Sequence, residues 1–202
     1  MLLSELTNFP EKHDEKFSDA LAKFIEKHSL KDFEGGQATV ITRGPHVWRS
    51  WFNDPGYERF LKYVEAHKGN KFLPKVLSKV REEPTQFKGM PKGMTIKYVK
   101  LEKLTEFPIS ILSDALDTLY FANVKPSVLP DTVEELAELS LTFKVQQDSD
   151  AESEEIKEAI LENKDFFKVV LDLMKHHDAN DLSSGNVMMR GTTPVINDPF
   201  KD

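Results

Sequence analysis

The sequence predicts an α+β fold in which a small sheet lobe precedes a mainly helical lobe. Up to residue 104, segments with the alternating pattern of β-strands come in two pairs, and a segment with helical apolar spacing precedes each pair. After residue 104 helical spacing dominates, and a short hairpin pattern follows near the end of the sequence. We therefore divide the chain into 1–104, an N-terminal helix plus the small sheet lobe, and 105–202, a helical lobe that ends in a hairpin.

The first lobe is predicted to contain two helices and four strands. In chain order these are a helix over 11–28, strands over 38–42 and 46–51, a helix from Pro55 to about Val64, and strands over 76–80 and 95–101. Gly44 and Pro45 mark the turn between the first two strands, because both residue types favour turns. A loop rich in Pro, Gly and Lys, 84–93, separates the last two strands.

The second lobe is predicted to contain three helices and a hairpin. Helical apolar spacing covers 109–121, 131–143 and 153–175. The acidic run 148–155 suits the start of the last of these helices, because carboxylates are electrostatically favoured at a helix N-terminus. Residues 187–196 are then predicted to form a short hairpin, in which Val-Met-Met and Pro-Val-Ile flank a turn that contains a glycine.

The composition is that of an ordinary globular protein and argues against several classes of function. The formal net charge of −7 and the pI near 5.5 disfavour a general nucleic-acid binder, which needs a basic face. No apolar run approaches the roughly 20 residues of a membrane span, and the N-terminus lacks a signal-like pattern. The absence of cysteine suits a reducing cytoplasm. We therefore expect a cytoplasmic protein without nucleic-acid or membrane partners, and leave its oligomeric state open.

The residues with the most chemical information lie close to the end of the sequence. Asp181 is followed five positions later by Asn186, and Asp198 comes after the predicted hairpin. The hairpin is expected to return Asp198 beside Asn186, so that a candidate base and two oxygen ligands converge. Phosphotransferases use such a layout to hold a substrate hydroxyl and Mg²⁺ ions around one triphosphate. The alternative is a capped turn and a hairpin in which the acidic residues are incidental.

Two stretches around this motif carry a family resemblance. They read Asp181-Leu182-Ser183-Ser184-Gly185-Asn186-Val187-Met188 and Pro194-Val195-Ile196-Asn197-Asp198-Pro199. Both resemble the early serine/threonine protein kinases of short-tailed bacteriophages, whose catalytic segment is roughly Asp-x-His-Ser-Gly-Asn-Ile-Met and whose metal-binding Asp precedes Pro. The match is specific over about 176–200 and rests on element order and spacing over 35–104. It implies a compact bilobal protein-kinase-like fold, ATP and Mg²⁺ as cofactors, and a host protein as substrate in the bacterial cytoplasm.

The resemblance assigns a role to each residue of the motif. Asp181 matches the catalytic-loop Asp that accepts the proton of the substrate hydroxyl. Asn186 matches the metal-binding Asn, and Asp198 matches the Asp that bridges Mg²⁺ to the phosphates.

The same resemblance implies which residues contact the nucleotide. They are Gly36, Ala38 and Val40 in the glycine-rich loop, Arg49 at the phosphate-anchoring strand position, and Glu102, Lys103 and Leu104 in the hinge that meets adenine through backbone groups. A carboxylate of the following helix is expected to pair with Arg49. Spacing does not decide between Glu58 and Glu65 for this role.

The sequence also departs from the pattern of the family. The glycine-rich loop lacks its full glycine set, and Arg49 replaces a lysine whose ammonium is not interchangeable with a guanidinium. Ala179-Asn180 replaces the His-Arg that usually precedes the catalytic Asp, and the sequence ends four residues after Asp198. Three interpretations follow: a minimal protein serine/threonine kinase, a pseudokinase that binds and inhibits a host protein, or a small-molecule phosphotransferase of the aminoglycoside-kinase type.

Overall fold

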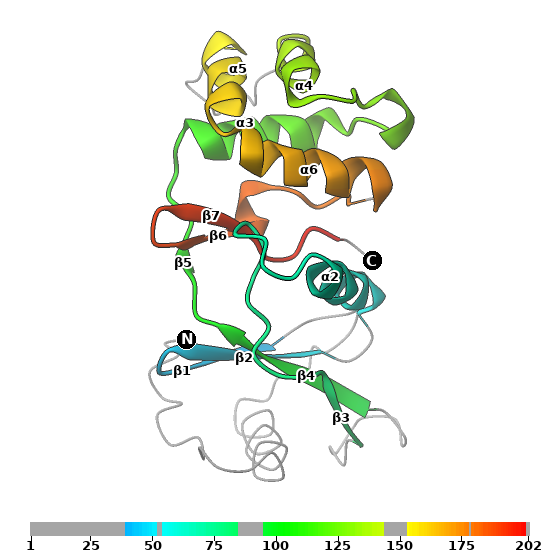
Figure 1. Cartoon of the computed structure of the whole chain (residues 1–202), viewed down its shortest axis with the longest axis vertical. Helices are drawn as coiled ribbons and strands as arrows, with labels where there is room; N and C mark the ends of the chain where they lie inside the picture. Colours follow the sequence, from blue (N-terminus) through cyan, green and yellow to red (C-terminus); the bar gives the residue numbers. More distant parts are fainter. Residues whose placement is uncertain (1–38, 52–53, 85–94, 144–152, 178, 201–202) are drawn as a thin grey trace. The chain divides into compact units, whose positions relative to one another are not determined.

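The computed structural model describes residues 39–51, 54–84, 95–143, 153–177 and 179–200, which form a mixed α+β structure as predicted (Figure 1). The predicted helix over 11–28 and the site residues Gly36 and Ala38 lie outside these ranges. Two compact units can be distinguished, and each is described by itself. The sheet unit contains the described residues up to Pro55 and those of 75–103, and the helical unit contains those of 56–74 and 104–200.

The sheet unit is built on one antiparallel sheet of four strands. The strands are β1 (Thr39–Arg43), β2 (His46–Trp51), β3 (Arg81–Pro84) and β4 (Thr95–Glu102), in the spatial order β1-β2-β4-β3. Gly44 takes a positive φ of 54° in the β1–β2 turn, a conformation that glycine adopts without steric cost. Trp51, Tyr98, Val99 and Leu101 are buried in the core of this unit. The predicted β1–β2 pair and the strand from 95 are confirmed.

The predicted strand over 76–80 is wrong, because the regular ladder with β4 begins only at Arg81. The earlier segment makes a single bridge, between Val76 and Leu101. Immediately after this bridge, the Ser78 hydroxyl accepts the backbone N–H of Lys100 at 2.9 Å. In a continuous ladder, a backbone carbonyl of the neighbouring strand would accept the Lys100 N–H. Here the Ser78 hydroxyl accepts it instead.

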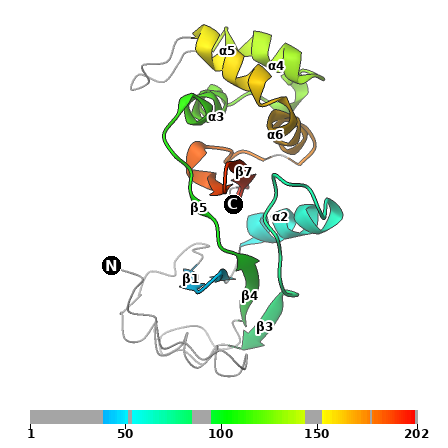
Figure 2. The ribbon, with the colours of Figure 1, turned by 60° about the vertical axis from the view of Figure 1, so that its left-hand side comes forward.

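The helical unit contains the five α-helices of the described chain. They are α2 (Pro55–Ala66), α3 (Ile111–Ala122), α4 (Val133–Ser140), α5 (Ser153–Glu162) and α6 (Lys164–His176), with a short 3-10 helix, η2 (Pro126–Val128), after α3. Helix α5 packs against α3 and α4 (Figure 2). Leu116, Leu136, Ile156 and Ile160 form the buried core between these three helices. The predicted helices that start near 55, 109 and 131 are confirmed.

The single helix predicted over 153–175 is wrong, because Asn163 divides it into α5 and α6. Asn163 has non-helical dihedral angles (φ −107°, ψ 35°), and its side-chain amide donates to the Ala159 carbonyl at 2.9 Å. Its own carbonyl accepts the N–H groups of Phe166 and Phe167, both at 3.0 Å, and so begins the next helix. The change of direction lets both phenylalanines enter the core, where each is at most 1% exposed.

A second antiparallel sheet lies in the helical unit. Its strands are β5 (Thr105–Glu106), β6 (Val187–Arg190) and β7 (Thr193–Ile196), in that spatial order. The β6–β7 pair is the hairpin that the sequence predicts, and Gly191 takes a φ of 62° in its turn. The segment after α2 is attached to this hairpin: the Phe72 carbonyl accepts the Ile196 N–H, and the Arg190 guanidinium donates to the carbonyls of Lys71 and Leu73. These contacts place 56–74, predicted within the first lobe, in the helical unit.

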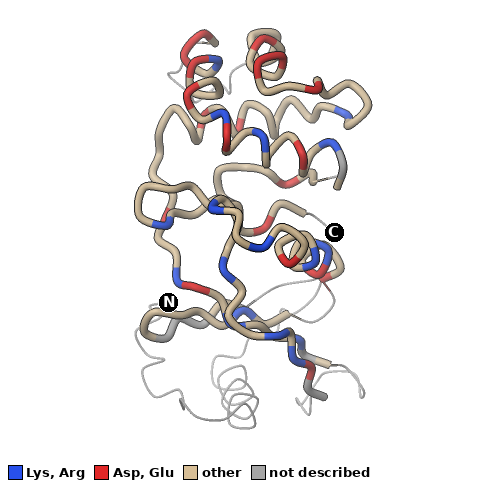
Figure 3. The backbone as a smooth tube through the Cα atoms, viewed as in Figure 1, with Lys and Arg blue, Asp and Glu red and all other residues tan. Residues whose placement is uncertain are grey.

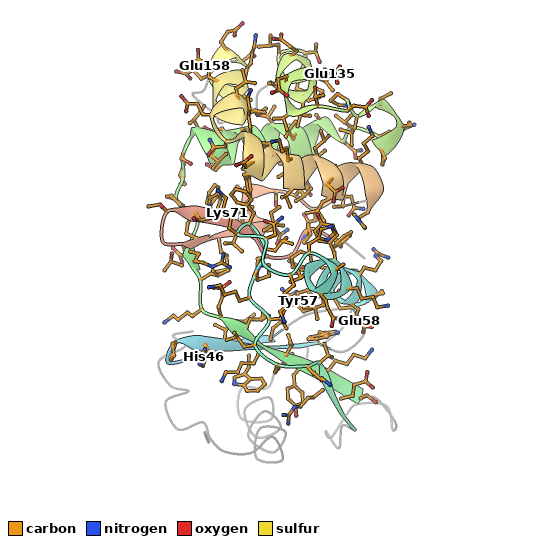
Figure 4. All side chains as sticks on the ribbon, viewed as in Figure 1. His46, Tyr57, Glu58, Lys71, Glu135 and Glu158 are labelled. Atoms are coloured by element: carbon orange, nitrogen blue, oxygen red, sulfur yellow. The ribbon has the colours of Figure 1, made fainter. Side chains whose placement is uncertain are left out.

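Charge is distributed unequally between the two units (Figure 3). Among the described residues, Lys and Arg outnumber Asp and Glu by eight to four in the sheet unit, whereas Asp and Glu predominate by 17 to ten in the helical unit. The exposed faces of α4 and α5 contribute strongly to this acidic excess, with Glu135 and Glu158 among their exposed carboxylates (Figure 4). In the part of the chain described here, no helix combines the length and the apolar character needed to cross a membrane.

Candidate functional site

The structure brings Asp181, Asn186 and Asp198 together through the backbone of the helical unit. The Asn197 N–H donates to the Asn186 carbonyl at 2.8 Å, which continues the pairing of β6 with β7 by one further contact. The Asp181 N–H donates to the Pro199 carbonyl at 3.1 Å. Asp198 therefore lies between Asn197, which is hydrogen-bonded to Asn186, and Pro199, which is hydrogen-bonded to Asp181. The predicted return of Asp198 to Asn186 is confirmed.

The side chain of Asn186 is oriented by the loop that contains Asp181. Asn186 is the last residue of the 3-10 helix η3 (Ser184–Asn186), and its backbone N–H donates to the Ser183 carbonyl at 3.0 Å. Its side-chain Nδ2 donates to the Asp181 carbonyl at 2.9 Å. Since Nδ2 is used in this bond, the amide oxygen Oδ1 is the atom that Asn186 can present to a cation.

Buried apolar residues hold this loop and hairpin in place, while the three polar residues are only half-buried. Leu182 is 4% exposed, Val187 is 3% exposed, and Val195 and Ile196 are fully buried. Asp181, Asn186 and Asp198 each keep intermediate exposure. The arrangement combines a fixed backbone with polar residues of intermediate exposure, while the Oδ1 atom of Asp198 is itself buried.

Asp117 of α3 is a site residue that the sequence analysis missed. Its Oδ1 accepts the backbone N–H of Ser184 at 2.7 Å, and its Oδ2 accepts the Ser184 hydroxyl at 2.8 Å. The two residues are 67 positions apart in the sequence. No local sequence pattern predicts this contact, because a single Asp in a helical segment looks in the sequence like any solvent-exposed residue.

The donor set of this site fits a hard divalent cation. The Asn186 amide oxygen and the Asp198 carboxylate are oxygen ligands of the kind that Mg²⁺ prefers, and Mg²⁺ commonly takes only one or two carboxylates and completes its shell with water and phosphate. Within the described ranges, no group of three or more His, Asp or Glu side chains is arranged to hold a metal ion.

Arg49 lies in the sheet unit, on β2, where it forms an ion pair with Asp54. The Nη2–Oδ2 distance is 3.8 Å, and both side chains are at most 10% exposed. Val40 is the direct cross-strand partner of Arg49 on β1, and directly opposed residues present their side chains on the same face of a sheet. The predicted glycine-rich loop residue and the predicted cation thus share one face of the sheet unit.

The two carboxylates considered as partners of Arg49 differ in exposure. Glu58, in the first turn of α2, is half-buried (Figure 4), whereas Glu65, near the end of the helix, is exposed. Both belong to the helical unit and Arg49 belongs to the sheet unit. Their pairing with Arg49 remains a prediction.

The predicted hinge, Glu102 to Leu104, is partly occupied by contacts inside the sheet unit. The N–H of Glu102 donates to the Lys75 carbonyl at 3.1 Å, and its carboxylate accepts the Lys75 N–H at 2.7 Å. The N–H of Lys103 donates to the Pro45 carbonyl at 3.3 Å. Leu104 is buried. Adenine contacts through the first two N–H groups would therefore have to replace existing hydrogen bonds.

A second polar cluster of the helical unit connects α2 with α6. The Tyr63 hydroxyl donates to Asp172 Oδ2 at 2.7 Å, and burial together with this carboxylate raises the pKa of Tyr63 well above its usual value. His177 lies edge-on to the Tyr63 ring at 4.7 Å, and its Nε2 is 4.0 Å from Asp172 Oδ2. This cluster fixes the docking of α2 on α6.

Comparisons with known proteins give no relative with which this site could be compared. The chain matches no protein family, no curated protein and no solved structure. Functional conclusions therefore depend on the residues and their geometry.

Proposed function

We propose that the protein is a Mg²⁺-dependent phosphotransferase, a phage-type serine/threonine kinase that transfers the γ-phosphoryl group of ATP to a host protein. The observation that supports this proposal best is the position of Asp198 in the chain. The residue before it is hydrogen-bonded to Asn186, and the residue after it is hydrogen-bonded to Asp181. Two hydrogen bonds thereby gather a base and two oxygen ligands, the set that phosphoryl transfer requires. The hairpin alone would bring these positions together, so the proposal is supported by the residue types found there, two aspartates and an asparagine.

Each residue of the set has a distinct task in this proposal. The Asp181 carboxylate orients the substrate hydroxyl and accepts its proton as the hydroxyl attacks phosphorus. Asn186, through Oδ1, and Asp198, through its carboxylate, would hold Mg²⁺. When bound, Mg²⁺ neutralises the charge on the phosphate oxygens. The intermediate exposure of Asp181 and Asn186 supports these tasks, because ligands can reach them while the backbone stays fixed.

Arg49 is proposed to contribute the cation that anchors phosphate, as the resemblance implies. Its guanidinium is always charged and can contact phosphate oxygens in a bidentate manner. The Asp54 carboxylate competes for the same guanidinium, at 3.8 Å. We therefore expect the contribution of Arg49 to ATP affinity to be smaller than that of an uncompensated lysine.

The second candidate function is that of a pseudokinase, a nucleotide-independent binder of a host protein. Two observations favour it: the buried ion pair of Arg49 with Asp54, and the use of the Glu102 and Lys103 N–H groups inside the sheet unit. Both groups would already be engaged before any nucleotide arrives. The kinase remains our first proposal, because a pure binder needs none of the three motif residues in this geometry.

Transfer of labelled γ-phosphate in a bacterial lysate separates the two candidates. We expect label on host proteins, or on the protein itself, with wild type and Mg²⁺. Asp181→Asn should lower the transfer rate by about 10²- to 10⁴-fold, the usual contribution of a general base, while Mg·ATP still raises the melting temperature. Wild-type labelling no greater than that of Asp181→Asn would reject the kinase. A wild type that neither transfers label nor gains stability from Mg·ATP supports the pseudokinase.

A further inference from the structure

We propose that Asp117 of α3 is a positioning residue that holds the proposed metal ligand Asn186 and the proposed base Asp181 in their working geometry. This inference rests on the proposed function. Asp117 acts through Ser184 and touches neither proposed ligand. Both of its carboxylate oxygens are committed to that single residue, at 2.7 and 2.8 Å.

The contact is stronger and more directional than an ordinary side-chain hydrogen bond. Hydrogen bonds to a carboxylate are shorter and roughly twice as strong as those between neutral groups, and two of them fix an orientation as well as a distance. Ser184 supplies one backbone and one side-chain donor. The backbone position of Ser184, and not only its side chain, is thereby tied to α3.

Ser184 is the residue through which this tie reaches the site. It begins η3, and η3 ends at Asn186 after one turn. The Nδ2 of Asn186 donates to the Asp181 carbonyl at 2.9 Å. A displacement of Ser184 therefore moves Asn186, and with it the hydrogen bond that sets the direction of Oδ1 and steadies Asp181.

Helix α3 is a suitable support for such a contact. The neighbours of Asp117 on the helix, Leu116, Thr118 and Leu119, are each at most 2% exposed. The helix therefore cannot rotate or shift without disturbing the core. The loop itself has fewer apolar anchors, Ala179 and Leu182 among them. Asp117 adds to these apolar contacts a polar connection between the packed helical core and the loop.

The test compares Asp117→Ala with Asp117→Asn and with Asp114→Ala, a matched control that removes a carboxylate one turn earlier on the same helix. The Mg²⁺ concentration that gives half of the ATP-dependent stabilisation is measured for each. Residues that orient metal ligands typically contribute 10- to 100-fold to metal affinity, so we expect Asp117→Ala to need about 10- to 100-fold more Mg²⁺. Asp117→Asn keeps an acceptor for the Ser184 N–H and should stay close to wild type, as should Asp114→Ala.

A second readout, hydrogen exchange of the 184–187 amides without nucleotide, tests the inference independently of any activity. Faster exchange in Asp117→Ala, with normal exchange in the α3 core, is expected. An unchanged Mg²⁺ requirement in Asp117→Ala, or unchanged exchange, overturns the positioning role. If Asp117→Ala does not fold, Ser184→Ala replaces it as the test, because it loses only the 2.8 Å hydrogen bond from the Ser184 hydroxyl. The Mg²⁺ requirement and the exchange rates should then rise by less than is expected for Asp117→Ala. If neither rises, the inference is overturned. A wild type that does not bind Mg·ATP rejects the proposed function, and exchange alone then decides whether Asp117 orders the loop.

Discussion

The sheet unit and the helical unit hold their candidate functional residues by different means. In the helical unit, backbone hydrogen bonds at 2.8 and 3.1 Å gather Asp181, Asn186 and Asp198, whose side chains stay half-buried. In the sheet unit, Arg49 is 6% exposed and is paired with the buried Asp54. Polar side chains that are positioned by backbone hydrogen bonds do not need an ion-pair partner from the protein. A buried charge such as that of Arg49 does need one, because an unpaired charge is costly to bury. The comparison predicts that substitutions in the helical set change function, and those in the sheet pair change stability first.

The largest effect is expected for Asp198→Ala. Removal of the carboxylate should abolish Mg·ATP binding or turnover without unfolding the protein, because the Asn197 and Pro199 backbone contacts do not depend on that side chain. Asn186→Ala should impair binding similarly through loss of Oδ1. The measurements are Mg²⁺-dependent thermal stabilisation by ATP and circular dichroism. Normal phosphoryl transfer by either variant would remove the metal assignment, and unfolding of either would contradict the comparison drawn above.

Asp54→Ala is expected to have the largest effect on stability. It leaves the buried Arg49 guanidinium without the nearby carboxylate, and breaking one side of a buried ion pair typically costs about 3 kcal/mol or more. Glu82→Ala is the matched control in the same unit. Its pair with Lys97, at 3.5 Å, is more exposed, with side chains 59% and 25% exposed, and should contribute less than about 1 kcal/mol. Denaturant unfolding measures both variants. Equal losses in the free energy of unfolding would show that burial does not determine how much these ion pairs contribute to stability.

Substitutions of Arg49 test whether the sheet unit contributes to ATP binding at all. Arg49→Lys should keep or raise ATP affinity, because the proposed kinase resemblance places a lysine at this position, and Arg49→Ala should lower it. Titration with Mg·ATP, corrected for the stability of each variant, gives the affinities. Normal ATP binding by a folded Arg49→Ala variant would mean that the alignment of this strand is wrong or that another cation serves.

The smallest effect is expected in the polar cluster of Tyr63 and Asp172. Tyr63→Phe removes one hydrogen bond to a partly exposed carboxylate and should cost about 1 kcal/mol. The pKa of Tyr63 is raised in the folded protein, so its stabilising contribution is complete below the unfolded pKa of about 10 and declines as the pH rises above it. The stability difference between wild type and Tyr63→Phe should therefore shrink above pH 10. A difference that grows there would contradict the direction of the shift.

The sequence alone determined the features that depend on neighbouring residues. The β6–β7 hairpin was predictable from its two short apolar segments and from Gly191, whose φ of 62° suits glycine in a tight turn. Because the register of a hairpin follows from its turn, the return of Asp198 to Asn186 was predictable as well. The helices that begin near 109 and 131 were predictable from the period of their apolar residues, whereas the division of 153–175 into α5 and α6 was not.

Tertiary structure decided the features that depend on a competing or distant partner. The segment around Ser78 formed no regular strand, and Asn163 ended helix α5. In both places a side chain bonds to a backbone group, and the sequence pattern does not show whether such a bond prevails over the ladder or the helix. Asp117 met Ser184 across 67 residues because the packed helical core placed α3 beside the loop. Periodicity and turn chemistry are local signals, whereas such a contact exists only once the chain has folded.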